Sequence, residues 1–219
     1  MIFRSKAPLR IGLAGGGTDV SPYSDQFGGV ILNATISKYA HASIELISDQ
    51  KIILHSIDQQ QEEIYDLSNQ LPINGTLDLL KGVYNRIQKD YPFELIGFKL
   101  YTHVEAPAGS GLGTSSTLVV SILGAFLQFL QVKMNEYEIA HYAYDIERVD
   151  LALAGGKQDQ YAATFGGFNY MEFMAENRVI VNPLRIRQEY INELENNLLL
   201  FFSSTTRESA TIIKEQQKN

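Results

Sequence analysis

Three glycines at alternate positions, followed by three hydroxyl residues, form the most informative stretch of the sequence. It runs from Pro107 to Ser116 and separates a predicted strand at 95–104 from a predicted apolar helix at 114–130. Glycine lets the backbone adopt positive φ angles and approach a ligand closely. The N–H groups at a helix start lack intrahelical partners and carry positive partial charge. The stretch is therefore a candidate binding site for polyphosphate.

A simpler interpretation of the same stretch is a turn whose hydroxyl residues cap the helix that follows. Two better-known phosphate loops are excluded. No Gly-Lys-Ser/Thr follows the glycines, as a Walker A loop would require, and the spacing differs from that of a dinucleotide-binding fingerprint. The cluster of hydroxyl residues directly after the glycines favours phosphate.

The elements that must position this loop are predicted from hydrophobic periodicity. Several strand-like segments come before most of the helical ones, which favours an α+β fold over strict βαβ alternation. Strands are predicted at 2–14, 29–36, 39–48, 51–57, 61–67, 95–104, 166–173, 178–182 and 198–203, and helices at 77–89, 114–130, 136–149, 187–195 and from Arg207 onward.

Composition narrows the possible functions. The net charge of −7 argues against a nucleic-acid partner, and the absence of cysteine excludes disulfides and thiolate metal sites. The longest apolar stretch, 118–130, is too short to span a bilayer, so no membrane partner is expected. Since residues 1–8 contain no signal-peptide core, we expect a cytoplasmic protein. The sequence leaves the oligomeric state open.

Three motifs together resemble those of the GHMP kinases, a superfamily that includes galactokinase, homoserine kinase and mevalonate kinase. The first is Ala-Pro-Leu-Arg-Ile-Gly-Leu-Ala-Gly-Gly-Gly-Thr-Asp at 7–19, the second is the glycine-rich loop, and the third is Gly-Gly-Lys-Gln-Asp-Gln-Tyr-Ala at 155–162. The Leu-Ala-Gly-Gly-Gly-Thr-Asp segment is most similar to the branch that acts on heptose phosphate. Three motifs in the right order are far more specific than any one of them.

The resemblance implies an N-terminal domain like domain 2 of ribosomal protein S5, over residues 1–183. It also implies that residues 184–219 begin a ferredoxin-like C-terminal domain, which we expect to be incomplete here. The implied activity is ATP-dependent phosphorylation of the anomeric hydroxyl of D-glycero-D-manno-heptose 7-phosphate, giving the 1,7-bisphosphate. Its implied cofactors are ATP and Mg²⁺, and its partner is a small sugar phosphate.

Site roles also follow from the resemblance. Asp159 matches the base that accepts the proton of the acceptor hydroxyl, and Arg10 the basic residue that stabilises the transferring phosphoryl group. Ser115 and Glu147 match the magnesium ligands. ATP is expected to contact Pro107, Gly109, Ser110, Gly111, Leu112, Gly113, Thr114, Ser115 and Ser116. The sugar phosphate is expected to contact Gly16, Gly17, Thr18 and Asp19. Lys157 and Arg207 are candidates for binding its phosphate, because each lies in a glycine- or hydroxyl-rich segment.

Each role has a structural alternative. Asp159 and Asp19 are also suited to capping a helix or turn, and on sequence physics the two readings of Asp19 are equally good. Arg10 is also compatible with a surface arginine, Glu147 with an exposed partner of Arg148, and Arg207 with a capped final helix. Galactokinase-like members carry Glu-His at the position of Gly16-Gly17, so these glycines leave room for a larger sugar.

Three other functions compete with a heptose phosphate kinase. One is a GHMP kinase for a fucose- or galactose-like sugar, and another is a sensor that binds ATP and sugar without turnover. The sensor is disfavoured because Arg10, Ser115, Glu147 and Asp159 are all present. RNA binding through an S5-like domain is disfavoured by the negative charge.

Overall fold

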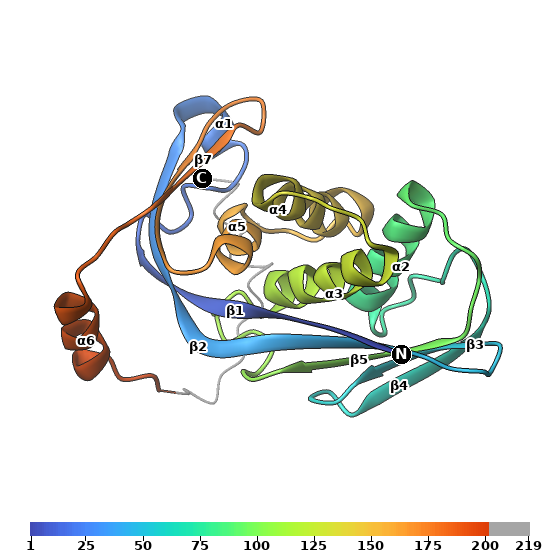
Figure 1. The fold of residues 1–219 in the computed structure, drawn as a ribbon. Helices are drawn as coiled ribbons and strands as arrows, with labels where there is room; N and C mark the ends of the chain where they lie inside the picture. Colours follow the sequence, from blue (N-terminus) through green and yellow to red (C-terminus); the bar gives the residue numbers. More distant parts are fainter. Residues whose placement is uncertain (202–219) are drawn as a thin grey trace.

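The computed structural model describes residues 1–201, and its strands form a single seven-stranded sheet (Figure 1). The sheet order is β4–β3–β5–β2–β6–β7, with β1 paired to β2. All neighbours are antiparallel except β3 and β5, which run parallel. The strands are β1 (Ile2–Ala14), β2 (Gly29–Leu46), β3 (Lys51–Ser56), β4 (Gln61–Asp66), β5 (Phe98–Val104), β6 (Phe168–Phe173) and β7 (Val179–Pro183).

The long strand β2 joins the two halves of the sheet. Its first part, 29–34, pairs with β6, and its second part, 40–46, pairs with β5. Strand β1 runs antiparallel along the other edge of β2, with register irregularities between Pro8 and Arg10 and between Gly12 and Ala14. These irregularities lie in the first of the three motifs.

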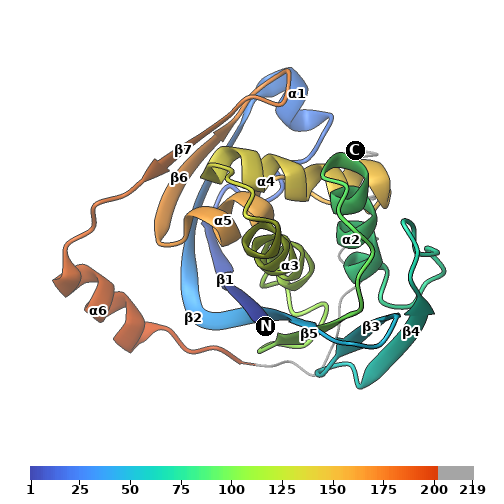
Figure 2. The ribbon, with the colours of Figure 1, turned by 45° about the vertical axis from the view of Figure 1, so that its right-hand side comes forward.

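One helix fills the main core. Helix α3 (Thr114–Leu130) lies along β1 and β2, and α2 (Asp78–Asp90) packs beside it (Figure 2). Twelve residues of α3 are buried, because its sequence is apolar on nearly every side. Gly124 lets α3 approach β1 closely, since a Cβ there would lie 2.4 Å from the Ser5 hydroxyl.

A smaller core lies between the other end of the sheet and two short helices. Helix α4 (Glu136–Asp145) runs into the π-helical turn η1 (Ile146–Asp150), and α5 (Gln158–Phe165) packs against α4. Ile31 of β2, Met171 and Phe173 of β6, and Tyr161 of α5 are buried together in this cluster. Both cores therefore contain residues of β2.

The α+β prediction is confirmed, and most predicted elements are found with bounds close to those observed. The prediction of two strands at 29–36 and 39–48 is wrong, because β2 continues through 37–38. The short helices α1 (Tyr23–Phe27) and α5 were not predicted. The strand predicted at 198–203 is not formed at 198–201, where the chain has no regular structure, and the predicted final helix lies outside the described residues.

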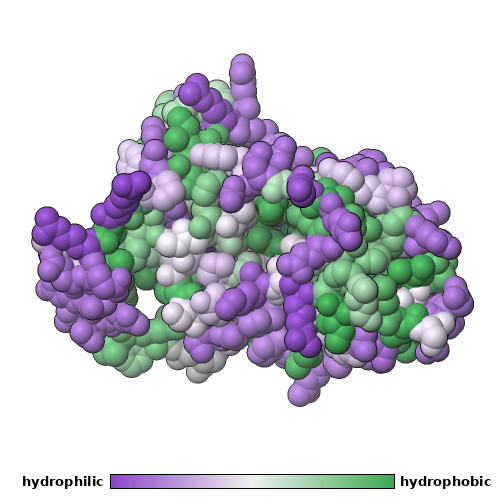
Figure 3. Space-filling view, in the orientation of Figure 1, coloured by the Kyte–Doolittle hydropathy of each residue, from purple (hydrophilic) through white to green (hydrophobic). Residues whose placement is uncertain are grey.

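Helix α6 (Gln188–Asn197) stands apart from the body of the domain in both ribbon views. It has no buried residue, and the face of it seen in Figure 3 is hydrophilic. The four residues after it, 198–201, are apolar and exposed. This arrangement is compatible with the predicted boundary at 183, which stays a prediction. None of the described helices is long and apolar enough to cross a membrane.

Candidate functional site

The glycine-rich loop has the backbone conformation that its sequence predicts. Gly109, Gly111 and Gly113 have φ angles of 74°, 77° and 75°, a region that favours glycine. Gly113 is the N-cap of α3, and no side chain caps this helix start. The reading in which the hydroxyl residues only cap α3 is therefore not supported at this position. The first N–H groups of α3 remain suited to an anion.

Arg10 and Asp159 meet beside this loop. Arg10 Nε donates a hydrogen bond to Asp159 Oδ1 at 2.6 Å, and Arg10 Nη1 donates to the Gly111 carbonyl at 2.7 Å. The Arg10 backbone N–H also donates to the Leu112 carbonyl. Asp159 lies against the helix start, since a Cβ at Gly113 would be 3.1 Å from its Cγ. Strand β1, the loop and α5 thus bring a cation, an uncapped helix start and a carboxylate together.

Asp19 is buried under the first turn of α5. Its Oδ2 accepts hydrogen bonds from the backbone N–H groups of Lys157 and Gln158, at 2.7 and 2.9 Å. Burial raises the pKa of Asp19, the N–H group of Gln158 opposes this shift, and the nearby charge of Asp159 adds to it. The geometry favours the capping reading of Asp19 over direct contact with a sugar.

The turn before Asp19 is fixed to β2 by Thr18. The Thr18 hydroxyl has the Gly15 and Val30 carbonyl oxygens within hydrogen-bond distance of its one proton, at 2.8 and 3.0 Å, and it accepts from the Val30 N–H. Gly15 has no room for a side chain, because a Cβ would lie 1.9 Å from the Val30 carbonyl oxygen. Gly16, in contrast, is exposed, and a Cβ there would meet nothing within 4 Å. Whether this open space serves a larger sugar stays a prediction.

A Cβ at either of the two glycines before α5 would press against a neighbouring side chain. A Cβ at Gly155 would lie 2.1 Å from Nη2 of Arg148, and one at Gly156 would lie 2.0 Å from Oδ2 of Asp19. Arg148 also donates to the Gly156 carbonyl. Arg148 and Asp19 therefore hold the segment that leads to Asp159 from two sides.

Glu147 is buried in η1, so the interpretation as an exposed carboxylate is wrong, although it does pair with Arg148, whose Nη1 lies 3.7 Å from Glu147 Oε1. The side chain of Gln160 donates to Glu147 Oε2 and to the Ser116 hydroxyl. Burial raises the pKa of Glu147, while Arg148, Ser116 and Gln160 lower it. The hydroxyl beside Glu147 in this arrangement is that of Ser116, whereas Ser115 is exposed in the first turn of α3.

The described residues contain no ready-made metal cluster of three or more acidic or histidine side chains. Mg²⁺ is commonly held by one or two carboxylates together with substrate phosphates and water, all of them oxygen donors. Ser115 and Ser116 end the glycine-rich loop, and all three side chains, those of Glu147, Ser115 and Ser116, offer oxygen ligands. Their chemistry therefore fits this mode of Mg²⁺ binding.

Lys157 and Arg207 were the two side chains expected to bind the phosphate of the substrate. The Lys157 side chain is only 3% exposed, and its Nζ lies 3.2 Å from Asp25 Oδ1. It faces a carboxylate and does not point into an open anion site. Arg207 lies outside the described residues.

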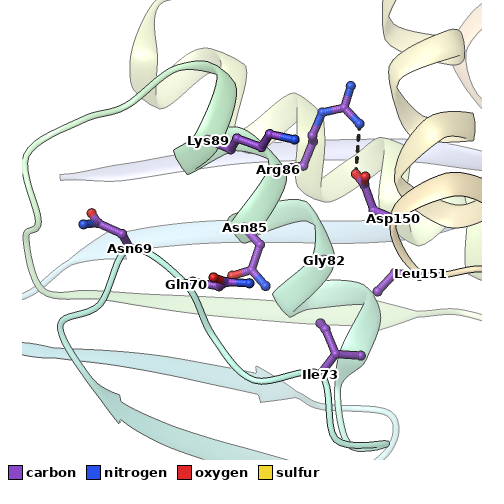
Figure 4. A pocket seen from close by; sticks show the side chains of 9 residues that line it. All are labelled: Asn69, Gln70, Ile73, Gly82, Asn85, Arg86, Lys89, Asp150 and Leu151. Atoms are coloured by element: carbon purple, nitrogen blue, oxygen red, sulfur yellow. Dashed lines mark hydrogen bonds and ion pairs between the residues drawn. The ribbon is translucent and has the colours of Figure 1, made fainter.

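A cavity of about 330 Å³ lies between α2, the loop before it and the end of η1 (Figure 4). Amide side chains of Asn69, Gln70 and Asn85 line it, together with apolar Ile73 and Leu151. Arg86, at its rim, forms an ion pair with Asp150. No pattern in the sequence predicts this cavity, because its walls come from segments far apart in the chain.

Sequence reasoning also missed Arg148 and Gln160. Gln160 stands next to Asp159 in the third motif, and its 0% exposure inside a polar cluster distinguishes it only once the fold is known. Arg148 follows Glu147 and was considered only as its partner. No pattern in the sequence marks either residue as part of the site.

The curved sheet with helices on one face, and a glycine-rich loop opening its central helix, define an α+β protein of the ribosomal S5-like fold. The same fold occurs in the solved mevalonate kinase of Methanococcus jannaschii, with a TM-score of 0.69 at 18% identity. Residues 78–167 match the N-terminal domain family of the GHMP kinases. The chain belongs to the GHMP kinase family.

Two similar proteins share about half of their residues with this chain. It is 51% identical to a D-glycero-alpha-D-manno-heptose 7-phosphate kinase of Campylobacter jejuni, over 98% of the chain. A solved D-glycero-D-manno-heptose 1-phosphate kinase of Bacteroides thetaiotaomicron superposes with a TM-score of 0.89, at 52% identity over 100% of this chain and 74% of that one. The chain spans 63% of the length of the Campylobacter protein.

Proposed function

We propose that this chain forms the catalytic part of an ATP-dependent sugar kinase that transfers the γ-phosphoryl group to a sugar hydroxyl. The observation that carries the proposal is the Arg10–Asp159 pair placed against the uncapped start of α3. An uncapped helix start binds phosphate, a carboxylate accepts a proton, and an arginine stabilises charge on a transferring phosphoryl group. Phosphoryl transfer needs these three functions together.

The proposed reaction uses residues in these positions. The β- and γ-phosphates lie over the loop from Pro107 to Ser116 and are bound by its N–H groups and by Ser110, Thr114 and Ser115. Asp159 accepts the proton of the sugar hydroxyl, whose oxygen then bonds to the γ-phosphorus. The bond from that phosphorus to the bridging oxygen breaks, and ADP leaves. Arg10 offsets negative charge on the group in transfer and orients Asp159 through their hydrogen bond.

Mg²⁺ would be held by Glu147 and Ser115 together with the phosphates, and would neutralise part of their charge when bound. Gln160 orients the Glu147 carboxylate, and Ser116 is hydrogen-bonded to Gln160. We propose the cavity beside η1 for the nucleoside end of ATP, because it is lined by Asp150, the last residue of the turn that carries Glu147, and by Leu151, which follows it. Its amide and apolar side chains suit a purine.

The substrate we propose is D-glycero-D-manno-heptose 7-phosphate, phosphorylated at its anomeric hydroxyl to the 1,7-bisphosphate. This substrate is taken from the names of the two similar proteins, which both specify a heptose phosphate and differ in the position of the phosphate. The open space at Gly16, next to Gly17 and Thr18, is compatible with a seven-carbon sugar. The cytoplasmic location and a second domain beginning at residue 184 stay predictions.

Another sugar is the second candidate. An L-fucokinase/L-fucose-1-P guanylyltransferase of Bacteroides fragilis is 28% identical over 96% of this chain. Fucose lacks the phosphate that a heptose phosphate carries, so the two candidates differ in their need for a second anion site. Arg207 remains our proposal for that site, together with Lys157 if its contact with Asp25 opens.

The test is a panel of acceptors with the complete gene product, ATP and Mg²⁺. Heptose 7-phosphate, heptose 1-phosphate, fucose and galactose are compared by ADP release, and the product is assigned by phosphorus NMR. We expect the highest kcat/KM with heptose 7-phosphate, and a new anomeric phosphate signal. A preference for fucose would replace the substrate, and ATP binding without transfer to any acceptor would support the sensor instead.

A further inference from the structure

Asp19 and the first turn of α5 are in direct contact, although they are almost 140 residues apart in the sequence. We propose that Asp19 is a positioning residue for Asp159: it fixes the start of α5 and does not itself hold the sugar. This inference rests on the proposed function, in which Asp159 accepts the proton of the acceptor hydroxyl.

The contact fixes the residues directly before Asp159. Asp19 Oδ2 accepts from the N–H groups of Lys157 and Gln158, and Asp159 is the next residue. Helix α5 has only eight residues, and its own N-cap, Lys157, provides no side-chain cap. A short helix depends strongly on tertiary contacts and on the satisfaction of its first N–H groups. Asp19 supplies that satisfaction from another part of the chain.

Gly156 is explained by the same contact. Its backbone is outside the left-handed region, so its conformation does not require glycine, yet a Cβ would lie 2.0 Å from Asp19 Oδ2. The absence of a side chain at 156 leaves space for the Asp19 carboxylate. Gly156 of the third motif and Asp19 of the first motif are therefore parts of one packing arrangement.

The burial of Asp19 argues against direct sugar binding. The residue is 2% exposed, and one of its two oxygens already accepts two N–H groups. A sugar hydroxyl needs an acceptor at the surface of a pocket. The Asp159 side chain, in contrast, is 23% exposed and faces the start of α3.

The experiment compares four variants of the complete gene product with the wild type: Asp19→Ala, Asp19→Asn, Gly156→Ala and Asn135→Ala. Asn135 caps α4 through a capping box, so its replacement is a matched loss of a helix cap outside the proposed site. For each variant we measure kcat, the KM for the sugar, thermal unfolding, and hydrogen exchange at the amides of residues 157–160.

We expect Asp19→Ala to lower kcat about 10- to 100-fold, with less than about a threefold change in the sugar KM, because misplacing a reacting group mainly slows the chemical step. Exchange at 157–160 should become faster. Asp19→Asn should recover most of kcat, since an amide oxygen accepts the same N–H groups. Gly156→Ala should reproduce the kcat loss, while Asn135→Ala should lower the unfolding temperature and leave kcat unchanged.

The opposite pattern overturns the inference. If Asp19→Ala raises the sugar KM with kcat retained, or leaves exchange at 157–160 unchanged, Asp19 does not position α5. The exchange measurement needs no turnover, so it tests the contact even if the wild type transfers no phosphate. Absence of transfer in the wild type would contradict the proposed function alone.

Discussion

Arg10 Nε lies 2.6 Å from Asp159 Oδ1, which joins β1 to α5 beside the glycine-rich loop. The same guanidinium donates to the Gly111 carbonyl, so one side chain holds both the loop and the carboxylate. Arginine suits this role, because its planar group carries several donors in fixed directions. The pair is 13% and 23% exposed, which leaves the carboxylate accessible while limiting its motion.

Replacing either member of the pair should reduce transfer strongly. We expect Asp159→Asn to lower kcat by about 10²- to 10⁴-fold, the usual contribution of a general base. Arg10→Lys should lower kcat by about 10-fold or more, since a single ammonium cannot bond both Asp159 and Gly111 in the same way. Steady-state kinetics with ATP and heptose phosphate measure both effects. Arg4→Ala, on the exposed side of the same strand, is the control.

Two glycines of the loop form a matched pair for a second prediction. Gly111 and Gly113 have φ angles of 77° and 75°, so alanine at either position should cost about 1–2 kcal/mol of stability. Only Gly113 faces Asp159, and a Cβ at Gly111 would meet nothing within 4 Å. We expect Gly113→Ala to lower kcat further than Gly111→Ala. Equal kinetic losses would contradict a contact between this position and Asp159.

The buried amide of Gln160 should be needed for stability. Gln160→Met removes the donor to Glu147 and Ser116 and keeps a side chain of similar length. A buried acceptor that loses its partner costs about 1–3 kcal/mol, so the free energy of unfolding should fall by that amount. Chemical denaturation measures it. Gln128→Met, on the exposed side of α3, should change stability by less than about 0.5 kcal/mol.

The ion pairs of Arg86 predict a dependence of stability on pH. Partial burial acts to raise the pKa of Asp90, but hydrogen bonds from Arg86 and Tyr142 lower it below its ordinary value. A carboxyl with a lowered pKa stabilises the fold above its ordinary pKa, and this contribution is lost as the pH falls through the lowered value.

Asp90→Asn should therefore reduce stability near neutral pH, and the difference from the wild type should shrink as the pH falls below about 4. Comparing the two proteins at each pH removes the opposing contributions of Asp19 and Glu147, whose pKa values are raised. Thermal unfolding across this pH range provides the measurement. Glu94→Gln, in the exposed loop after α2, is the control.

Hydrophobic periodicity and turn residues predicted the elements whose formation depends on residues close by in the sequence. Helix α3 was predicted with its observed bounds, because a long apolar segment follows a glycine-rich turn. Helix α5 was missed because eight residues give too little periodicity, and its start is satisfied by a side chain from residue 19. The sequence pattern predicted two strands separated at Ser37-Lys38. The structure has one strand, β2, which pairs with β6 before these two residues and with β5 after them.

The residues of the candidate site were predicted from the sequence, but their burial was not. Motifs identified Arg10, Asp159 and the loop, and the structure places them together. Their roles stay predictions. Burial was the property that the sequence did not reveal, since Glu147, Asp19 and Lys157 are enclosed by segments distant along the chain. Each of them has partners that only the tertiary structure brings near.

Strand β2 contributes residues to both hydrophobic clusters, and this affects how the domain unfolds. Ile31 belongs to the smaller cluster and Ala40, Ala42 and Ile44 to the larger one, all on one uninterrupted strand. Neither cluster can melt without removing hydrogen-bonded partners from the other, so heating should give one cooperative transition. The residues that meet at the glycine-rich loop would then be lost all at once, and activity and secondary structure should disappear at the same temperature.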